Sequence, residues 1–456
     1  MFNPYLRSGF CETRAIVLEA TMENPSPSIP KDWVRRFFTI WTGQVFSLFG
    51  SAIVQFALIW WLAQKSGSAT VLALATLAGL LPTVVLGPFA GALVDRWNRR
   101  RIMMIADTTI AAFTLLLAYL FAAETVQIWH IYVILVVRAL GGAFHFPAMA
   151  ASTPLMVPEN QLTRVNGLNQ TLQGVNALIA PPAGALLIGL LPTQGILLID
   201  VGTALVAILP LFFISIPQPT RQDILPRAVR PSLLQDVQDA LTYLRSWPGL
   251  VAVIFMAFFL NFLITPIESL LPLLVTKHFA KGVMELGFIN SAQGVGMIVG
   301  GVILSVWGGF RRKIATSLTG VIGLGIGVML LGLVPANLFL IAIIGSILLG
   351  AMVPITNGPI GALLQSVVRP DMQGRVMSLL NSGAMAISPL GLLIAGPLSD
   401  ALGIQVWFWA GGLMCVIIGI AGFFFPVIMS IEQNKETTRG PGFTDECSRH
   451  QQQRIA

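Results

Sequence analysis

Charged side chains are scarce in this chain. Only 10% of its 456 residues are Asp, Glu, Lys or Arg, whereas 55% are hydrophobic and the mean hydropathy is +0.80. A soluble domain carries about 25% charged residues because its surface must face water. The shortage therefore excludes an ordinary soluble protein and indicates a chain that crosses a membrane many times.

Cysteine and histidine are also rare, with three Cys and four His in the whole chain. Cys11, Cys415 and Cys447 lie far apart, two of them in polar ends, so we expect no disulfide and no structural zinc site. No GxxxxGK[ST] phosphate loop occurs, which argues against ATP as the driving force. No nucleophile–base pair can be recognised, so we expect neither an enzyme nor a bound cofactor.

What the chain has instead is long apolar runs, most of which reach the roughly 20 residues that span a bilayer as a helix. We expect twelve transmembrane helices, at residues 37–62, 70–94, 102–123, 129–153, 165–190, 195–215, 249–275, 285–307, 314–334, 338–364, 376–399 and 405–430. The fold class is therefore an all-α membrane protein.

The net charge of +7 could suggest nucleic acid, but its placement argues against that partner. We assign 23 of the 27 Lys and Arg to segments on one side of the membrane. Basic loops are retained in the cytoplasm, so we expect both termini there and the lipid bilayer of the cell membrane as the surroundings.

The polar, proline-bearing segment 216–247 divides the chain. We expect a cytoplasmic segment 1–36, a six-helix bundle 37–215, a cytoplasmic linker 216–247, a second bundle 248–430 and a cytoplasmic tail 431–456. Met22 is an alternative to Met1 as the start of the chain.

A short basic hairpin joins the second and third apolar runs. It reads Gly91-x-x-x-Asp95-Arg96-x-Asn98-Arg99-Arg100, and we expect a left-handed conformation at Asn98, where the chain reverses. A second copy runs from Gly301 to Lys313 and keeps Trp307 and Arg311 at an offset of 210 positions from Trp97 and Arg101. A repeat of that length indicates two parallel, pseudo-symmetric halves of six helices.

The hairpin resembles the signature loop between helices 2 and 3 of the major facilitator superfamily, with Asn98 in the usual glycine place and Ser305 replacing the aspartate in the second copy. Further blocks, at Phe38–Gln44, Arg138–His145, Thr153–Pro158 and Gly374–Leu379, resemble the macrolide-efflux branch of the drug:proton antiporters. The resemblance covers about residues 37–430. It implies the major facilitator fold, proton-coupled efflux and alternating access, and it leaves the substrate open.

The resemblance also implies a conformational latch on the cytoplasmic side. Asp95 ends a helix, where the dipole disfavours a negative charge, so it needs a positive partner. That partner would be the N-terminus of the eleventh helix. The residues of this latch are Gly91, Asp95, Arg96, Arg99, Arg100, Gly374 and Arg375.

Charged residues inside the apolar runs are the candidates for proton coupling. Arg138 should face a carboxylate in the bundle interior, either for coupling or as a purely structural ion pair. Asp107 could contact substrate or, as we favour, pair with the hairpin arginines, and Asp200 is expected to be structural. Glu268 lies roughly 13 Å from the outer boundary and is the leading proton carrier, unless it is exposed at a helix mouth.

Amides at helical spacing predict a substrate cavity. The fifth apolar run carries a stripe that includes Asn169, Gln173 and Asn176, and polar groups in hydrocarbon must face a cavity or another helix. The following Pro181–Ala185 resembles the antiporter motif of this superfamily, although ordinary small-residue packing would explain it too. Further cavity candidates are Gln44, Gln55, Asn261, Asn357 and Asn381.

These observations favour a secondary transporter that exports an amphipathic small molecule, macrolide-like or similar, in exchange for protons, and that acts as a monomer. The alternatives are an uncoupled facilitator or importer of a small metabolite, an exporter of a siderophore-like compound, and a membrane scaffold that transports nothing. The polar stripes argue against the scaffold.

Overall fold

The computed structural model describes residues 32–94, 97–218, 242, 247–368 and 370–432. In these residues all regular structure is helical, and twelve helices are long and apolar enough to cross a membrane. The expectation of an all-α membrane protein with twelve transmembrane helices is therefore confirmed.

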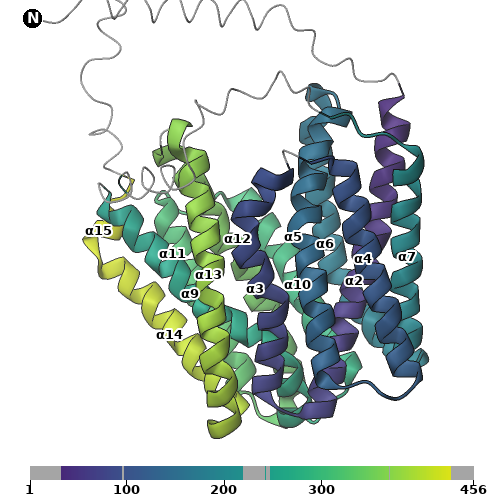
Figure 1. Ribbon diagram of the computed structural model, residues 1–456. Helices are drawn as coiled ribbons and strands as arrows, with labels where there is room; N and C mark the ends of the chain where they lie inside the picture. Colours follow the sequence, from purple (N-terminus) through teal and green to yellow (C-terminus); the bar gives the residue numbers. More distant parts are fainter. Residues whose placement is uncertain (1–31, 95–96, 219–241, 243–246, 369, 433–456) are drawn as a thin grey trace, which may run out of the picture.

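The helices form two groups of six (Figure 1). The N-terminal half consists of α2 (Trp33–Ser66), α3 (Ala69–Val94), α4 (Arg99–Ala122), α5 (Ile128–Met156), α6 (Glu159–Leu190) and α7 (Thr193–Phe213). The C-terminal half consists of α9 (Pro248–Leu273) with its π-helical end η3 (Leu274–His278), α10 (Val283–Trp307), α11 (Lys313–Leu333), η4 (Ala336–Leu338), α12 (Phe339–Val367), α13 (Pro370–Leu402), α14 (Ile404–Phe424) and the short α15 (Pro426–Met429).

The halves meet through two helix pairs, α3 with α13 and α6 with α10. In each pair the second helix of one half packs against the fifth helix of the other. This exchange of roles is what a pseudo-twofold axis between two equivalent halves requires.

Several helices begin outside their apolar runs. Helix α6 begins at Glu159 instead of 165, and α13 begins at Pro370 instead of 376. Hydropathy identifies only the part of a helix that lies in hydrocarbon, so it does not detect a polar first turn outside the bilayer. The last helix ends early, at Phe424, because Pro426 has no N–H to continue it.

Asn98 does not adopt the left-handed conformation that we expected. Its φ is −68°, and its side chain accepts a hydrogen bond from the Arg101 N–H at 3.1 Å. It is the N-cap of α4, a role in which asparagine satisfies an otherwise free helix N–H.

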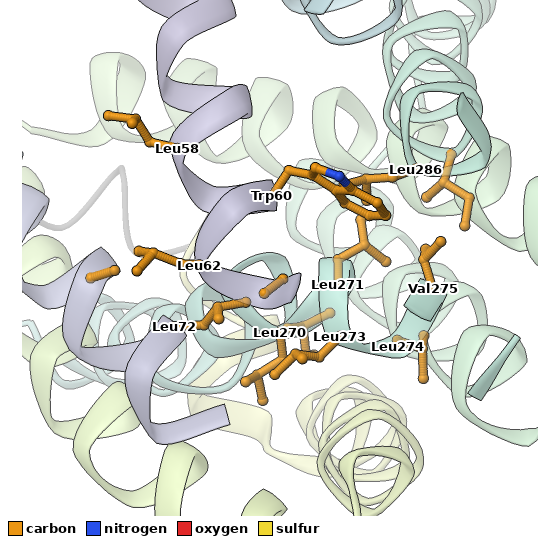
Figure 2. Close-up of a cluster of buried hydrophobic side chains, with 14 of the residues drawn as sticks. Leu58, Trp60, Leu62, Leu72, Leu270, Leu271, Leu273, Leu274, Val275 and Leu286 are labelled. Atoms are coloured by element: carbon orange, nitrogen blue, oxygen red, sulfur yellow. The ribbon is translucent and has the colours of Figure 1, made fainter. Parts of the chain in front are cut away.

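For orientation we call the end with the α3–α4 and α10–α11 connections the basic side, because it carries Arg99–Arg101 and Arg311–Lys313. The other end is the opposite side. There a cluster of buried apolar side chains joins the two halves (Figure 2). This apolar plug comprises Leu58, Trp60 and Leu62 of α2, Leu72 of α3, Leu270, Leu271, Leu273, Leu274 and Val275 of α9 and η3, and Leu286 of α10, all at most 6% exposed.

In the described part of the chain, every hydrogen bond between the halves lies toward the opposite side. Ser269 of α9 bonds to Thr76 and to the Leu72 carbonyl of α3, and Ser291 of α10 donates to the Leu178 carbonyl of α6. The segments of α6 and α10 nearer the basic side have many exposed residues, Gln173 and Val302 among them. The halves are thus held together at the opposite side, whereas no hydrogen bond joins their described residues toward the basic side.

Helices of the C-terminal half approach to backbone contact at glycines. A Cβ at Gly300 of α10 would overlap the Ala351 backbone of α12, whereas the neighbouring Gly301 has nothing within 4 Å of that position. Small residues allow two helix backbones to approach this closely. Within a membrane, van der Waals packing takes the place of the hydrophobic effect in holding helices together.

We expect Gly300→Ala to lower the stability of the protein by about 1–3 kcal/mol, because the added methyl group forces α10 and α12 apart. Reaction of the buried Cys415 with a thiol dye during heating measures this, after Cys11 and Cys447 have been replaced by serine. Gly301→Ala is the matched control and should leave the midpoint temperature of the Cys415 reaction unchanged or raise it slightly. Equal effects of both substitutions would contradict the packing argument.

Candidate functional site

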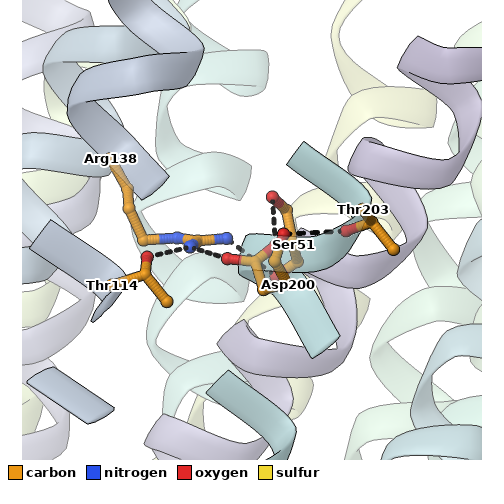
Figure 3. Close-up of polar contacts among 5 residues, drawn as sticks. All are labelled: Ser51, Thr114, Arg138, Asp200 and Thr203. Atoms are coloured by element: carbon orange, nitrogen blue, oxygen red, sulfur yellow. Dashed lines mark hydrogen bonds and ion pairs between the residues drawn. The ribbon is translucent and has the colours of Figure 1, made fainter. Parts of the chain in front are cut away.

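Arg138 of α5 lies inside the N-terminal half and binds Asp200 of α7 (Figure 3). Its Nη1 lies 2.7 Å from Asp200 Oδ2 and 3.4 Å from Thr114 Oγ1 of α4, and its Nη2 donates to the Ser51 carbonyl of α2 at 3.1 Å. The Ser51 hydroxyl donates to the other oxygen of Asp200 at 3.1 Å. This charged layer ties together four of the six helices.

The ion pair is almost enclosed, with side-chain exposures of 10% for Arg138 and 3% for Asp200. A lone arginine in the bilayer centre costs roughly 3 kcal/mol on insertion scales, and a carboxylate partner offsets that cost. The structure therefore brings Arg138 together with Asp200 and not with Glu268.

Asp107 of α4 has different partners from those we expected. Its Oδ2 accepts a hydrogen bond from Gln44 of α2 at 3.2 Å, and its Oδ1 lies 3.4 Å from His145 Nε2 of α5. The hairpin arginines bind helix-end carbonyls instead. Arg99 donates to Ala151 at 3.0 Å, and Arg100 donates to Phe212 at 2.7 Å and to Leu211.

The two polar clusters form layers in register. Gln44 and Ser51, Asp107 and Thr114, and Arg138 and His145 are each seven residues apart on α2, α4 and α5. Seven residues are two helical turns, so the layers lie about 10 Å apart along the bundle. The sequence analysis assigned no role to His145. Its position seven residues after Arg138, on the same helix face, is the pattern that indicates one.

Glu268 of α9 lies between the halves. Its side chain is exposed, and its carboxylate accepts a side-chain hydrogen bond from Gln293 of α10. It forms no ion pair with any cation of the described residues. The plug begins two residues further along α9, at Leu270, so this carboxylate lies next to the plug.

The amides of α6 line the face that turns toward α2. Asn169 accepts a hydrogen bond from Trp41 Nε1 at 2.8 Å, and Gln173 is exposed. The side-chain oxygen of Asn176 is buried and has no partner among the described residues. A polar atom left in this condition is available to a ligand or water.

The antiporter-like segment of α6 packs on both halves. A Cβ at Gly184 would lie 2.9 Å from the Phe56 ring of α2, and Ala185 and Pro182 contact Gly287 of α10. The segment therefore lies in the contact that closes the opposite side.

The remaining cavity candidates have diverse surroundings. Gln55 and Asn357 are exposed, while Gln44 is turned toward Asp107. Asn261 lies two turns before Glu268 on α9 and donates to its own helix at Ala257, at 2.9 Å. The side chain of Asn381 lies outside the described residues.

The cytoplasmic latch falls largely on residues outside the described part of the chain and stays a prediction. Asp95 and Arg96 lie outside the described residues. Gly91 belongs to α3, and Gly374 and Arg375 belong to α13, but their side-chain positions also lie outside the described part.

The family model described as Major Facilitator Superfamily matches residues 40–289 and 267–445. The chain belongs to this superfamily. It is a membrane transporter and not an enzyme, and the family and efflux resemblance read from the sequence is confirmed.

Relatives of this transporter are drug efflux pumps. It is 34% identical to macrolide efflux protein A of Streptococcus pyogenes, over 85% of this chain and 95% of that protein. It is 29% identical to the multidrug efflux pump Tap of Mycolicibacterium fortuitum, over 84% and 94% of the two chains.

Solved structures share the fold. A bacterial homologue of the human lysosomal transporter Spinster, in an inward-facing and unoccupied conformation, aligns with a TM-score of 0.67 at 14% identity, covering 89% of this chain and 99% of that one. The inward-open xylose transporter XylE from E. coli aligns with a TM-score of 0.59 at 16% identity, covering 85% and 96%.

We expect Arg138→Gln and Asp200→Asn each to destabilise this transporter by about 3–5 kcal/mol, because each leaves one buried charge without its partner. The double substitution Arg138→Met with Asp200→Leu should recover most of that loss, since it removes both charges. Thermal reaction of Cys415 with a thiol dye measures all three variants. A double variant as unstable as the singles would mean that the two residues do not act as a pair.

Proposed function

We propose that this transporter exports an amphipathic small molecule, macrolide-like or similar, in exchange for protons by alternating access. The observation that carries the proposal is Glu268, an exposed carboxylate without a cationic partner in the described chain, next to the apolar plug. In the proposed mechanism an opening between the halves leads from the basic side to this carboxylate. The drug efflux relatives support the substrate class.

The proposed orientation places the basic side and both termini in the cytoplasm of a cell whose plasma membrane holds the protein as a monomer. The arginines and lysine of the two repeated hairpins support it, because basic loops are retained on the cytoplasmic side. Substrate would then enter the opening from the cytoplasm or the inner leaflet of the membrane.

The proton step rests on the apolar plug that begins next to Glu268. A neutral carboxyl group enters an apolar environment at much lower cost than a carboxylate does. Protonation from outside would therefore allow the halves to close around Glu268, and release of the proton to the cytoplasm would return the charged form to a wet opening. Gln293, which donates a hydrogen bond to the carboxylate, stabilises that charged form.

Glu268→Gln fixes the neutral state, so we expect uphill efflux to fail while binding survives. The measurement is accumulation of a radiolabelled macrolide by proteoliposomes under an imposed pH gradient. Glu285→Gln is the control, because Glu285 caps its own helix, with the Gly282 N–H 3.0 Å from its Oε2, and should leave accumulation intact.

Two results would contradict the coupling proposal. If the Glu268→Gln protein still concentrates the macrolide, Glu268 is not the carrier and Asp107 is the next candidate. If the unmodified protein equilibrates the macrolide without responding to the pH gradient, it is an uncoupled facilitator.

The orientation gives a separate prediction. A membrane-impermeant maleimide should label Gln173→Cys in inside-out vesicles at least about tenfold faster than in right-side-out vesicles, because the exposed Gln173 faces the opening. Ala180→Cys, two turns further along α6 and 2% exposed, should stay unlabelled from either side. Faster labelling of Gln173→Cys in right-side-out vesicles would reverse the proposed orientation.

A further inference from the structure

Asp400 connects the two halves at the rim of the apolar plug. It lies in the last turn of α13, and its Oδ1 accepts the Ala69 N–H of α3 at 2.7 Å. Its Oδ2 accepts the Thr70 N–H at 2.9 Å and the hydroxyls of Ser68 and Thr70, both at 2.7 Å. One carboxylate of the C-terminal half thus receives four hydrogen bonds from the start of a helix in the N-terminal half.

Two of these donors, the Ala69 and Thr70 N–H groups, are of the kind that a helix start leaves without partners. The first N–H groups of a helix have no carbonyl within it, and the dipole makes that end partly positive. A helix usually obtains its cap from its own chain segment, as α10 does from Glu285. In helix α3 the Ser68 hydroxyl accepts the Val71 N–H at 3.4 Å, but the Ala69 and Thr70 N–H groups obtain their acceptor from the other half. That part of the cap exists only while the opposite side is closed.

The position of Asp400 on its own helix adds to this dependence. It lies at the C-terminal end of α13, where the dipole disfavours a negative charge. If the halves separated at this end, Asp400 would lose four donors and keep the unfavourable dipole, and the Ala69 and Thr70 N–H groups would lose their acceptor.

Close packing brings the carboxylate within reach. Gly396 lies one turn before Asp400 on α13, and a Cβ there would be only 2.9 Å from the Thr70 Cα and 3.0 Å from the Ala73 Cβ. A larger side chain at this position would hold α13 away from α3.

Lys277 makes a complementary contact with the neighbouring helix end. It belongs to η3, and a Cβ built on Gly67 would lie 3.5 Å from its Cε and 3.7 Å from its Nζ. Gly67 caps the C-terminal end of α2, which is partly negative and therefore attracts the ammonium group. Both charged side chains are exposed, so they border the plug without entering it.

We propose that Asp400, assisted by Lys277, is an electrostatic clamp that holds the opposite side closed and sets the preference of the empty transporter for the conformation described here. The proposal rests on the alternating access proposed above. Each transport cycle must break the clamp to open the opposite side and re-form it on return.

Spin labels across the opposite side test the clamp directly. In a protein without native cysteines, Ala123→Cys in the α4–α5 connection and Asn337→Cys in η4 place one label on each half. Their distance distribution, measured in lipid discs without substrate, reports how much of the population is open at this end.

We expect Asp400→Asn to raise the ratio of open to closed populations by about tenfold, the factor equivalent to losing one charge-assisted hydrogen bond. The pair Ser68→Ala with Thr70→Ala should raise it less, because the backbone N–H donors remain. Glu285→Gln is the matched control and should leave the ratio unchanged, since its cap lies within one half.

A distance distribution of Asp400→Asn identical to that of the parent protein would overturn the clamp, and so would an equal shift in Glu285→Gln. A different failure would overturn alternating access itself. In that case the parent protein would never open at this end, even with a macrolide and low pH.

Discussion

A polar group in hydrocarbon must find its partner within the protein, and this constraint governs the rest of the structure. Two clusters of the N-terminal half meet it internally, because Arg138 binds Asp200 and Asp107 binds Gln44 and approaches His145. Groups satisfied in this way hold one half together and do not depend on its position relative to the other. Glu268, in contrast, lies between the halves, where its surroundings change whenever the halves move.

The two halves reach rigidity by different means. Two polar layers join α2, α4, α5 and α7, whereas backbone contact at glycines such as Gly300 and Gly350 joins α10 to α12. Both kinds of contact specify one arrangement and resist sliding. Under the proposed alternating access, motion would therefore be concentrated where the halves meet, at α3 with α13 and at α6 with α10.

The sequence predicted the helices, the family and the two-half plan well, because apolar length and a repeat of 210 positions are properties of the chain alone. It did not predict the partners of charged residues. Asp107 was expected to bind hairpin arginines that are near in sequence, yet it approaches His145, which is 38 positions away and adjacent only after α4 and α5 have packed. The role of Asp400 was not predicted for the same reason. This aspartate ends α13, and its hydrogen-bond donors belong to the start of α3, about 330 positions earlier in the chain.

One element carries three of the features on which transport would depend. Glu268, the plug residues Leu270–Val275 and Lys277 follow one another on α9 and η3 within about 13 Å of helix. Pro272 has no N–H, and the backbone after it continues as a π-helix, in which the Phe279 N–H donates to Leu274 and the Lys281 N–H to Val275. Because the carboxylate, the plug and one arm of the clamp are joined covalently in this order, α9 cannot open the opposite side without moving Glu268. Under the proposed proton coupling, a change in the protonation of Glu268 would therefore act on the same segment that closes the plug, and proton binding and gating would share α9 and η3.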